Sequence, residues 1–137
     1  MILGIGTDIV EVKRFAVWKN YSETQLLRVF SKDELQDCLT GDTLNLQKMA
    51  SRFAAKEAFY KALSQALVNL GFTKNTFLFL FCCQHVKVAK TKWGVPVLKA
   101  DWGVFETKVG EKLPNIKTEL SISHEESYAV AFVILIG

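Results

Sequence analysis

The sequence predicts an α+β fold in which a long helix packs on an antiparallel sheet. Residues 43–70 contain neither proline nor glycine and are rich in Ala, Leu, Lys and Gln, which predicts the longest helix of the chain. Strand-forming residues dominate three other segments, 1–12, 116–123 and 128–136. The last two are separated by a short polar turn, which is typical of neighbouring antiparallel strands.

Length and composition predict one folded domain. The chain has 137 residues, half of them apolar and 23% charged, which supplies a hydrophobic core and differs from the composition of a disordered segment. We therefore expect residues 1–137 to form a single domain. A net charge of +3 is too small for a protein with the dense basic surface of a dedicated nucleic-acid binder, but it allows a local basic patch.

The cysteines and the N-terminus favour a cytoplasmic protein. Cys38, Cys82 and Cys83 are odd in number and two are adjacent, which is a poor disulfide framework and lacks the C-x-x-C spacing of a zinc site. The adjacent pair is more simply interpreted as buried apolar side chains. The first twelve residues have no basic region before their apolar part, unlike a signal peptide, and the most apolar run, 77–83, is too short to span a membrane.

Local signals place the shorter helices of the first half. Apolar spacing over 13–30 predicts one or two short helices. A capping box at Ser31 and Glu34 predicts another short helix that ends near Gly41. Gly71 is the expected end of the long helix.

The segment after the long helix predicts a hairpin and a second helix. Residues 77–89 and 95–98 are rich in strand-forming side chains and are joined by a loop, 90–94. Residues 101–112 are expected to be helical.

The first strand carries two glycines and a misplaced acid. Gly4 and Gly6 indicate a close backbone approach or a bulge. They do not form a dinucleotide fingerprint, because Ile9 occupies the position of the third glycine. Asp8 falls on the same side as Val10, where a carboxylate is costly unless it meets a cation or several donors. A divalent cation and a structural partner such as Lys or Arg are both possible interpretations.

Glu57 is a second misplaced acid, on the predicted long helix. At 100° per residue it shares a stripe with apolar side chains. Lys61, one turn later, can form an ion pair worth only about 0.2 to 0.5 kcal/mol, well below the cost of burying a charge. A hard divalent cation shared with Asp8 would compensate both carboxylates. The other members of the stripe are Leu46, Ala50, Phe53 and Tyr60.

His124 stands at the end of a predicted strand, beside Ser121 and Ser123. A histidine there can donate to a phosphate or transfer a proton near neutral pH, although a single histidine is more often an ordinary surface residue. A Ser–His nucleophile pair is disfavoured, because no G-x-S-x-G turn is present.

Taken together, these segments resemble a known family. The N-terminal segment MILGIGTDIVEVKRF (1–15), the helical run RFAAKEAF (52–59) and the tripeptide ISH (122–124) occur in this order and spacing, with Gly94 and Pro96 matching a G-x-P hairpin. The chain resembles the small bacterial holo-acyl-carrier-protein synthases of the phosphopantetheinyl transferase superfamily. The resemblance therefore implies the 4'-phosphopantetheinyl transferase fold.

The resemblance implies a reaction and the residues that carry it. The reaction is transfer of 4'-phosphopantetheine from coenzyme A to a serine of apo-acyl carrier protein, leaving adenosine 3',5'-bisphosphate. Asp8 and Glu57 would be the catalytic pair and the Mg²⁺ ligands. Arg52 and Lys61 would lie near coenzyme A phosphates, and His124 would reach the same ligand from a neighbouring subunit of a homotrimer.

The resemblance also implies a docking surface, and the sequence departs from the family pattern at one segment. Arg14, with Lys13 and Arg28, would bind the acidic recognition helix of the carrier protein. Many family members continue with Gly-Thr-Gly after the K-A-L motif, whereas this chain has SQALV at 64–68. The general base is not identified by any motif; Glu11, Glu57 and a metal-bound water are all candidates.

Two other interpretations remain open. The chain could be a catalytically weak binding module that grips an acidic partner through its basic residues, with Asp8 and Glu57 merely paired to Lys or Arg. In a purely structural interpretation, His124 and Lys61 are incidental surface residues. Divalent metal plus coenzyme A would raise the melting temperature of a transferase and leave a binding module unchanged.

Overall fold

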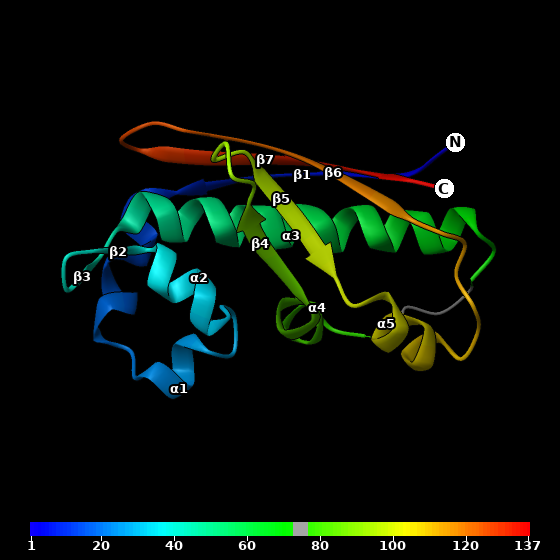
Figure 1. Ribbon diagram of the computed structural model, residues 1–137, viewed down its shortest axis with the longest axis horizontal. Helices are drawn as coiled ribbons and strands as arrows, with labels where there is room; N and C mark the ends of the chain where they lie inside the picture. Colours follow the sequence, from blue (N-terminus) through cyan, green and yellow to red (C-terminus); the bar gives the residue numbers. More distant parts are fainter. Residues whose placement is uncertain (73–76) are drawn as a thin grey trace.

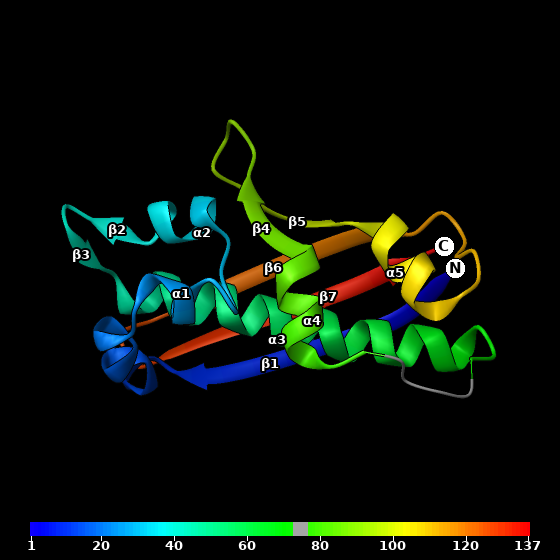
Figure 2. The ribbon, with the colours of Figure 1, turned by 90° about the horizontal axis from the view of Figure 1, so that it is seen from below.

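The structure is a computed structural model that describes residues 1–72 and 77–137. A long helix lies along one face of a three-stranded antiparallel sheet (Figures 1 and 2). The predicted α+β arrangement is thereby confirmed. In sheet order the strands are β1 (Ile2–Glu11), β7 (Tyr128–Ile136) and β6 (Lys117–His124), and the helix is α3 (Leu46–Asn69).

Two glycines let β1 touch α3 through backbone atoms. A Cβ atom added to Gly6 would lie 1.8 Å from the carbonyl oxygen of Ala58, and one added to Gly4 would lie 2.0 Å from that of Ala62. The close backbone approach expected from Gly4 and Gly6 is confirmed. Small residues on both elements therefore bring the inner face of β1 onto α3.

The free edge of β1 is bound by side chains of α3. β1 is the outer strand of the sheet, so one row of its backbone groups has no partner strand. Three helix side chains spaced four residues apart bind three of these groups, spaced two residues apart. The hydrogen bonds are Lys61 Nζ to Thr7 O (3.0 Å), Ile5 N to Gln65 Oε1 (2.7 Å) and Asn69 Nδ2 to Leu3 O (2.8 Å).

Short helices follow β1 at one end of the molecule (Figure 1). Residues 13–30 form a 3₁₀ helix and a single α-turn, as the apolar spacing predicted. The next helix begins with the predicted capping box, in which Glu34 N donates to Ser31 Oγ and Ser31 N donates to Glu34 Oε1. The elements are η1 (Val12–Asn20), α1 (Glu23–Leu26) and α2 (Lys32–Asp37).

The long helix starts later than predicted. Residues 43 and 44 pair in a small hairpin, β2 (Leu39–Thr40) with β3 (Thr43–Leu44), which turns at Gly41 with φ +63°. Asn45 then caps α3 by accepting from Lys48 N, so the helix begins at Leu46. At its other end Gly71 has φ +92°, which confirms the predicted glycine stop.

One strand prediction is partly wrong. The first part of 77–89 is helical, as α4 (Phe79–His85), and only its end is a strand, β4 (Val86–Lys90). As a helix the segment buries Cys82 and Cys83 in the core, and its Phe81 ring packs edge-on to Phe105. Tertiary packing thus outweighs the strand propensity of these aromatic residues.

The remaining elements agree with the predictions. β4 pairs with β5 (Pro96–Ala100) in an antiparallel hairpin whose last pair is Lys90 with Pro96. The helix expected in 101–112 is α5 (Trp102–Val109), capped by Asp101. In the described residues 1–72 and 77–137, no helix combines the length and the apolar character needed to cross a membrane.

A buried ion pair joins four of these elements. The Lys56 ammonium of α3 lies 2.7 Å from Glu34 Oε1 of α2, and both side chains are fully buried. Lys56 also donates to the carbonyl oxygens of Val29 and Cys83. The second oxygen of Glu34 accepts from Val88 N of β4 at 2.9 Å. Every charge of the pair is therefore hydrogen-bonded, which burial requires.

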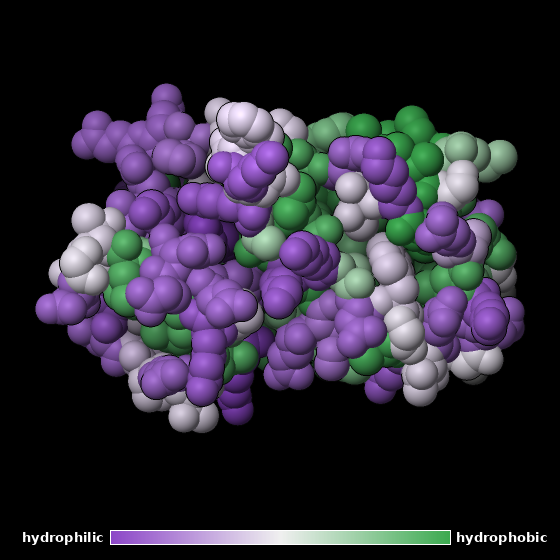
Figure 3. Space-filling view, in the orientation of Figure 1, coloured by the Kyte–Doolittle hydropathy of each residue, from purple (hydrophilic) through white to green (hydrophobic). Residues whose placement is uncertain are grey.

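The face of the sheet opposite α3 is apolar and exposed. The strand register places Ile5 and Ile9 of β1 on the same face as Val130 and Phe132 of β7. These side chains are 43%, 64%, 37% and 41% exposed, respectively. In the space-filling view, apolar residues also gather over the sheet near the two chain ends (Figure 3).

Candidate functional site

Asp8 and Lys61 form an ion pair between β1 and α3. Asp8 lies on the inner face of β1, opposite Ala131 of β7. Lys61 Nζ lies 3.1 Å from Asp8 Oδ1. The Glu57–Lys61 pair considered from the sequence is thus not the contact that the lysine makes; it binds Asp8 and the Thr7 carbonyl. The second carboxylate oxygen, Asp8 Oδ2, is buried and has no hydrogen-bond partner.

Glu57 belongs to the same site. Partial burial raises the pKa of the Glu57 carboxyl above its usual value, and the nearby negative charge of Asp8 raises it further. Lys61 and Arg14 act in the opposite direction and lower it. The structure therefore brings together two carboxylates whose mutual repulsion is only partly compensated by the surrounding cations.

This arrangement fits a hard divalent cation. The buried Oδ2 atom of Asp8 lacks a partner, and the charge on Glu57 is disfavoured by its neighbour. Among the described residues no cluster of three or more His, Cys, Asp or Glu side chains is suited to hold a metal. Mg²⁺ commonly uses only one or two carboxylates, with water and substrate phosphates completing its shell. The donor set thus matches a cation that is bound together with a phosphate substrate.

A basic cavity of about 250 Å³ lies between α3, the β4–β5 hairpin and β6. Arg52 and His124, two of the predicted ligand-binding residues, both line it. Lys48 and Lys90 add two further cationic side chains to its wall. Lys61, the third predicted ligand-binding residue, lies with Asp8 instead. The cavity is therefore suited to an anion, and its hairpin wall includes the G-x-P residues.

Arg52 is held in place from two sides. Its side chain is 5% exposed, Nη1 donates to the Lys48 carbonyl at 3.2 Å, and Nη2 lies 3.7 Å from Asp37 Oδ2. Its Nε atom is buried and has no hydrogen-bond partner. A buried guanidinium with a free donor can bind an acceptor that enters the cavity.

The predicted docking residues lie on or near η1. The Arg14 guanidinium packs over the Phe53 ring at 5.0 Å from its centre. Lys13 is exposed and pairs with Glu11 at 3.2 Å. Arg28 is exposed in the segment after α1. Arg14 is thus the one whose charge reaches the Asp8 and Glu57 site, since it also lowers the pKa of Glu57.

Sequence reasoning missed two cationic residues of the cavity. Lys48 precedes Arg52 by one helical turn, so its spacing could have placed it on the same side of α3. Lys90 is the last residue of β4, beside the G-x-P turn. Within one chain His124 lines the same cavity as Arg52, and its contribution to the site of a neighbouring subunit remains a prediction.

Comparison with known proteins assigns the chain to one family. Residues 4–133 match the family model described as the 4'-phosphopantetheinyl transferase superfamily. The chain belongs to this superfamily. Its relatives include a holo-[acyl-carrier-protein] synthase of Treponema denticola, 37% identical over the full length of both chains. Another, from Ehrlichia canis, is 36% identical over 98% of this chain and 94% of that protein.

Solved structures of the superfamily have the same fold. A structure described as the Chronobacterium ammoniagenes ACPS-CoA complex superposes with a TM-score of 0.77 and 30% identity, covering 96% of this chain and 95% of that one. A holo-(acyl-carrier-protein) synthase from Bacillus anthracis in complex with CoA (3',5'-ADP) has a TM-score of 0.66 and 29% identity, covering 98% and 96%. The predicted phosphopantetheinyl transferase fold is confirmed.

Proposed function

We propose that this protein transfers 4'-phosphopantetheine from coenzyme A to a serine of apo-acyl carrier protein and releases adenosine 3',5'-bisphosphate. The proposal takes residues 1–137 as one transferase domain. The observation that carries it is the pair Asp8 and Glu57, one with an orphaned buried oxygen and the other with a raised pKa, in a chain of this superfamily. The full-length synthase relatives support the same reaction.

Asp8 and Glu57 are proposed to hold Mg²⁺ together with the coenzyme A pyrophosphate. The bound cation would supply positive charge at the reacting phosphate and a template for both reactants. Asp8 Oδ2 provides a ligand that no protein donor occupies. Lys61, against Asp8 Oδ1, adds a fixed positive charge where the phosphates bind.

The basic cavity is proposed to bind a phosphate of coenzyme A. Arg52 is already immobilised by Asp37 and the Lys48 carbonyl, so little side-chain entropy is lost when it binds an anion. His124 also lines this cavity and adds an imidazole ring to its wall.

The carrier protein is proposed to dock on η1. Arg14, with its guanidinium over Phe53, lies next to the carboxylate pair and would bind an acidic helix close to the reacting groups. Lys13 and Arg28 would extend this basic surface, since both are exposed.

We further propose a cytoplasmic homotrimer. The exposed apolar face of the sheet, which includes Ile9 and Phe132, is suited to burial against other copies of this chain. His124 would then approach the site of a neighbouring subunit. The three free, buried cysteines agree with a reducing compartment. Sedimentation velocity that showed a monomer at micromolar concentration would contradict the trimer.

The transferase proposal is tested by intact-mass spectrometry of an apo-acyl carrier protein incubated with this protein, coenzyme A and Mg²⁺. The expected result is the gain of one phosphopantetheine group, abolished by a chelator. Asp8→Asn should abolish the gain, whereas Asp42→Asn, at an exposed turn, should not. A product yield unaffected by both the chelator and Asp8→Asn would refute the metal assignment.

One observation favours the binding-module alternative, namely the direct Asp8–Lys61 ion pair. In that case the carboxylate needs no metal. Melting temperatures separate the two functions: Mg²⁺ with coenzyme A should stabilise the transferase, and neither should stabilise a module that binds only an acidic protein.

A further inference from the structure

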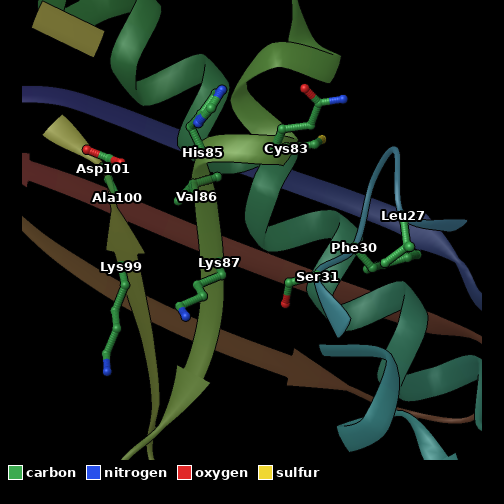
Figure 4. A pocket seen from close by; sticks show the side chains of 11 residues that line it. Leu27, Phe30, Ser31, Cys83, His85, Val86, Lys87, Lys99, Ala100 and Asp101 are labelled. Atoms are coloured by element: carbon green, nitrogen blue, oxygen red, sulfur yellow. The ribbon is translucent and has the colours of Figure 1, made fainter. Parts of the chain in front are cut away.

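A second cavity, of about 530 Å³, lies apart from the proposed transferase site. It opens between the loop after α1, the end of α4 and the base of the β4–β5 hairpin (Figure 4). None of its lining residues lines the cavity of Arg52 and His124. Its volume is in the range of pockets that bind small organic ligands, about 300 to 1,000 Å³.

Two lysines face each other across the hairpin at this cavity. Lys87 of β4 and Lys99 of β5 are register partners, and both side chains line the cavity. The close-up shows them running in the same direction beside the strands (Figure 4). Like charges at directly opposed strand positions are unfavourable unless an anion lies between them. Both side chains are exposed, so water screens part of this repulsion, and an anion bound between the two ammonium groups would remove the rest.

The nearby acids neutralise the two lysines only in part. Asp33 lies 4.0 Å from Lys87, but its side chain is 87% exposed, and such surface pairs contribute little. Asp101 also lines the cavity, but its carboxylate accepts from Val104 N at the start of α5. His85 contributes a further nitrogen-bearing ring to the wall.

The opposite wall is apolar. Phe30, which is 1% exposed, lines the cavity there beside the partly exposed Leu27, whereas the buried Val86 lies on the hairpin side next to Lys87. Figure 4 shows Leu27 and Phe30 on the side away from the two lysines. A ligand that spans the cavity would thus meet cations at one end and hydrocarbon at the other.

We infer that this cavity binds an amphipathic anion, with a phosphate or carboxylate head between Lys87 and Lys99 and a hydrocarbon part against Leu27 and Phe30. The inference does not depend on the proposed transferase function, because the two sites share no residue. A phosphate monoester, with up to two charges, matches two ammonium groups better than a carboxylate does.

Isothermal titration calorimetry with octyl phosphate, octanoate and octanol tests the site on the full chain. We expect saturable binding of octyl phosphate, weaker binding of octanoate and none of octanol. The double substitution Lys87→Met and Lys99→Met should weaken octyl phosphate binding by about tenfold or more. Lys112→Met removes a lysine exposed in the segment after α5 and should leave the affinity unchanged.

Several results would overturn the inference. The first is that neither octyl phosphate nor octanoate binds at about 1 mM. The second is that octanol binds as tightly as octyl phosphate, and the third is that the double substitution leaves the affinity for octyl phosphate unchanged. Saturating coenzyme A should leave the affinity for octyl phosphate unaltered, so competition would also overturn it by moving the ligand to the transferase site. Urea unfolding verifies that each variant is folded. Because both lysines are exposed, replacing them should not disturb the fold.

Discussion

Gly6→Ala is expected to force β1 away from α3. A Cβ atom at this position would lie 1.8 Å from the Ala58 carbonyl oxygen and 2.7 Å from Ala62 N, both of which are backbone atoms that no rotamer change can move. Real Cβ contacts essentially never fall below 3.0 Å, so the two elements must separate by about 1 Å. Overpacking of this kind typically costs about 1 to 3 kcal/mol of unfolding free energy.

The same displacement should reduce the rate of transfer by more than the loss of folded protein would. Asp8 follows Gly6 by two residues on the same strand face, and Glu57 adjoins Ala58 on the helix. Separating the elements therefore separates the two proposed metal ligands. A misplacement of about 1 Å at a reacting centre can cost about 100-fold in rate.

The assay combines urea unfolding with the rate of carrier-protein modification. Gly103→Ala is the matched control, because its nearest contact is Asp101 Oδ1 at an ordinary 3.6 Å. Gly103 lies inside α5, where alanine is the better helix former by about 0.8 to 1 kcal/mol. The control should be at least as stable as the wild type. If the Gly6→Ala variant unfolded at the wild-type urea concentration and modified the carrier protein at the wild-type rate, the close-approach argument would be refuted.

Four further predictions concern the charged groups. Lys56→Met should cost about 3 to 5 kcal/mol in urea unfolding because it leaves Glu34 buried and unpaired, and adding Glu34→Leu should restore much of it; a double variant less stable than the single one would contradict this. Because the pKa of Glu57 is raised, its contribution to stability is lost as pH rises through that value; Glu57→Gln should therefore melt higher than the metal-free wild type at pH 7, with the difference shrinking in acid. The same proton competes with Mg²⁺, so calorimetry should show weaker Mg²⁺ binding to the wild type as pH falls. Arg14→Ala should slow carrier-protein association in a salt-dependent manner and leave coenzyme A affinity unchanged in surface plasmon resonance; equal loss of both would argue against docking.

Much of the fold followed from local patterns, and the errors have a local cause. The capping box at Ser31, the glycine stop at Gly71 and the close approach at Gly6 all act within a few residues or one contact, so they could be predicted. The helical state of Phe79–His85 could not, because strand propensity and a buried helix give the same apolar run. Only its packing against Phe105 distinguishes them.

The site residues could be predicted where a charged residue occupies a position that the sequence pattern assigns to apolar side chains. Asp8 and Glu57 were identified because acids are out of place on apolar faces, and the structure brings them together. Glu34 was identified only as a helix cap. Its second role, as the partner of Lys56, depends on a contact across 22 residues of sequence that no local pattern reveals. Lys48 and Lys90 were missed because lysines on a surface are expected everywhere.

The three side chains that bind the free edge of β1 also determine where Asp8 stands along α3. Four residues of helix advance about 6.0 Å and two residues of strand about 6.6 Å, so Lys61, Gln65 and Asn69 match the strand only in one alignment. A shift of two residues would carry Asp8 about 6.6 Å along the helix, beyond sharing a cation with Glu57. Gln65 lies in the segment that departs from the Gly-Thr-Gly pattern of the family, and Asn69 directly follows that segment, one helical turn after Gln65. The last two turns of α3, although they lie beyond the carboxylates, therefore help to determine the spacing between Asp8 and Glu57.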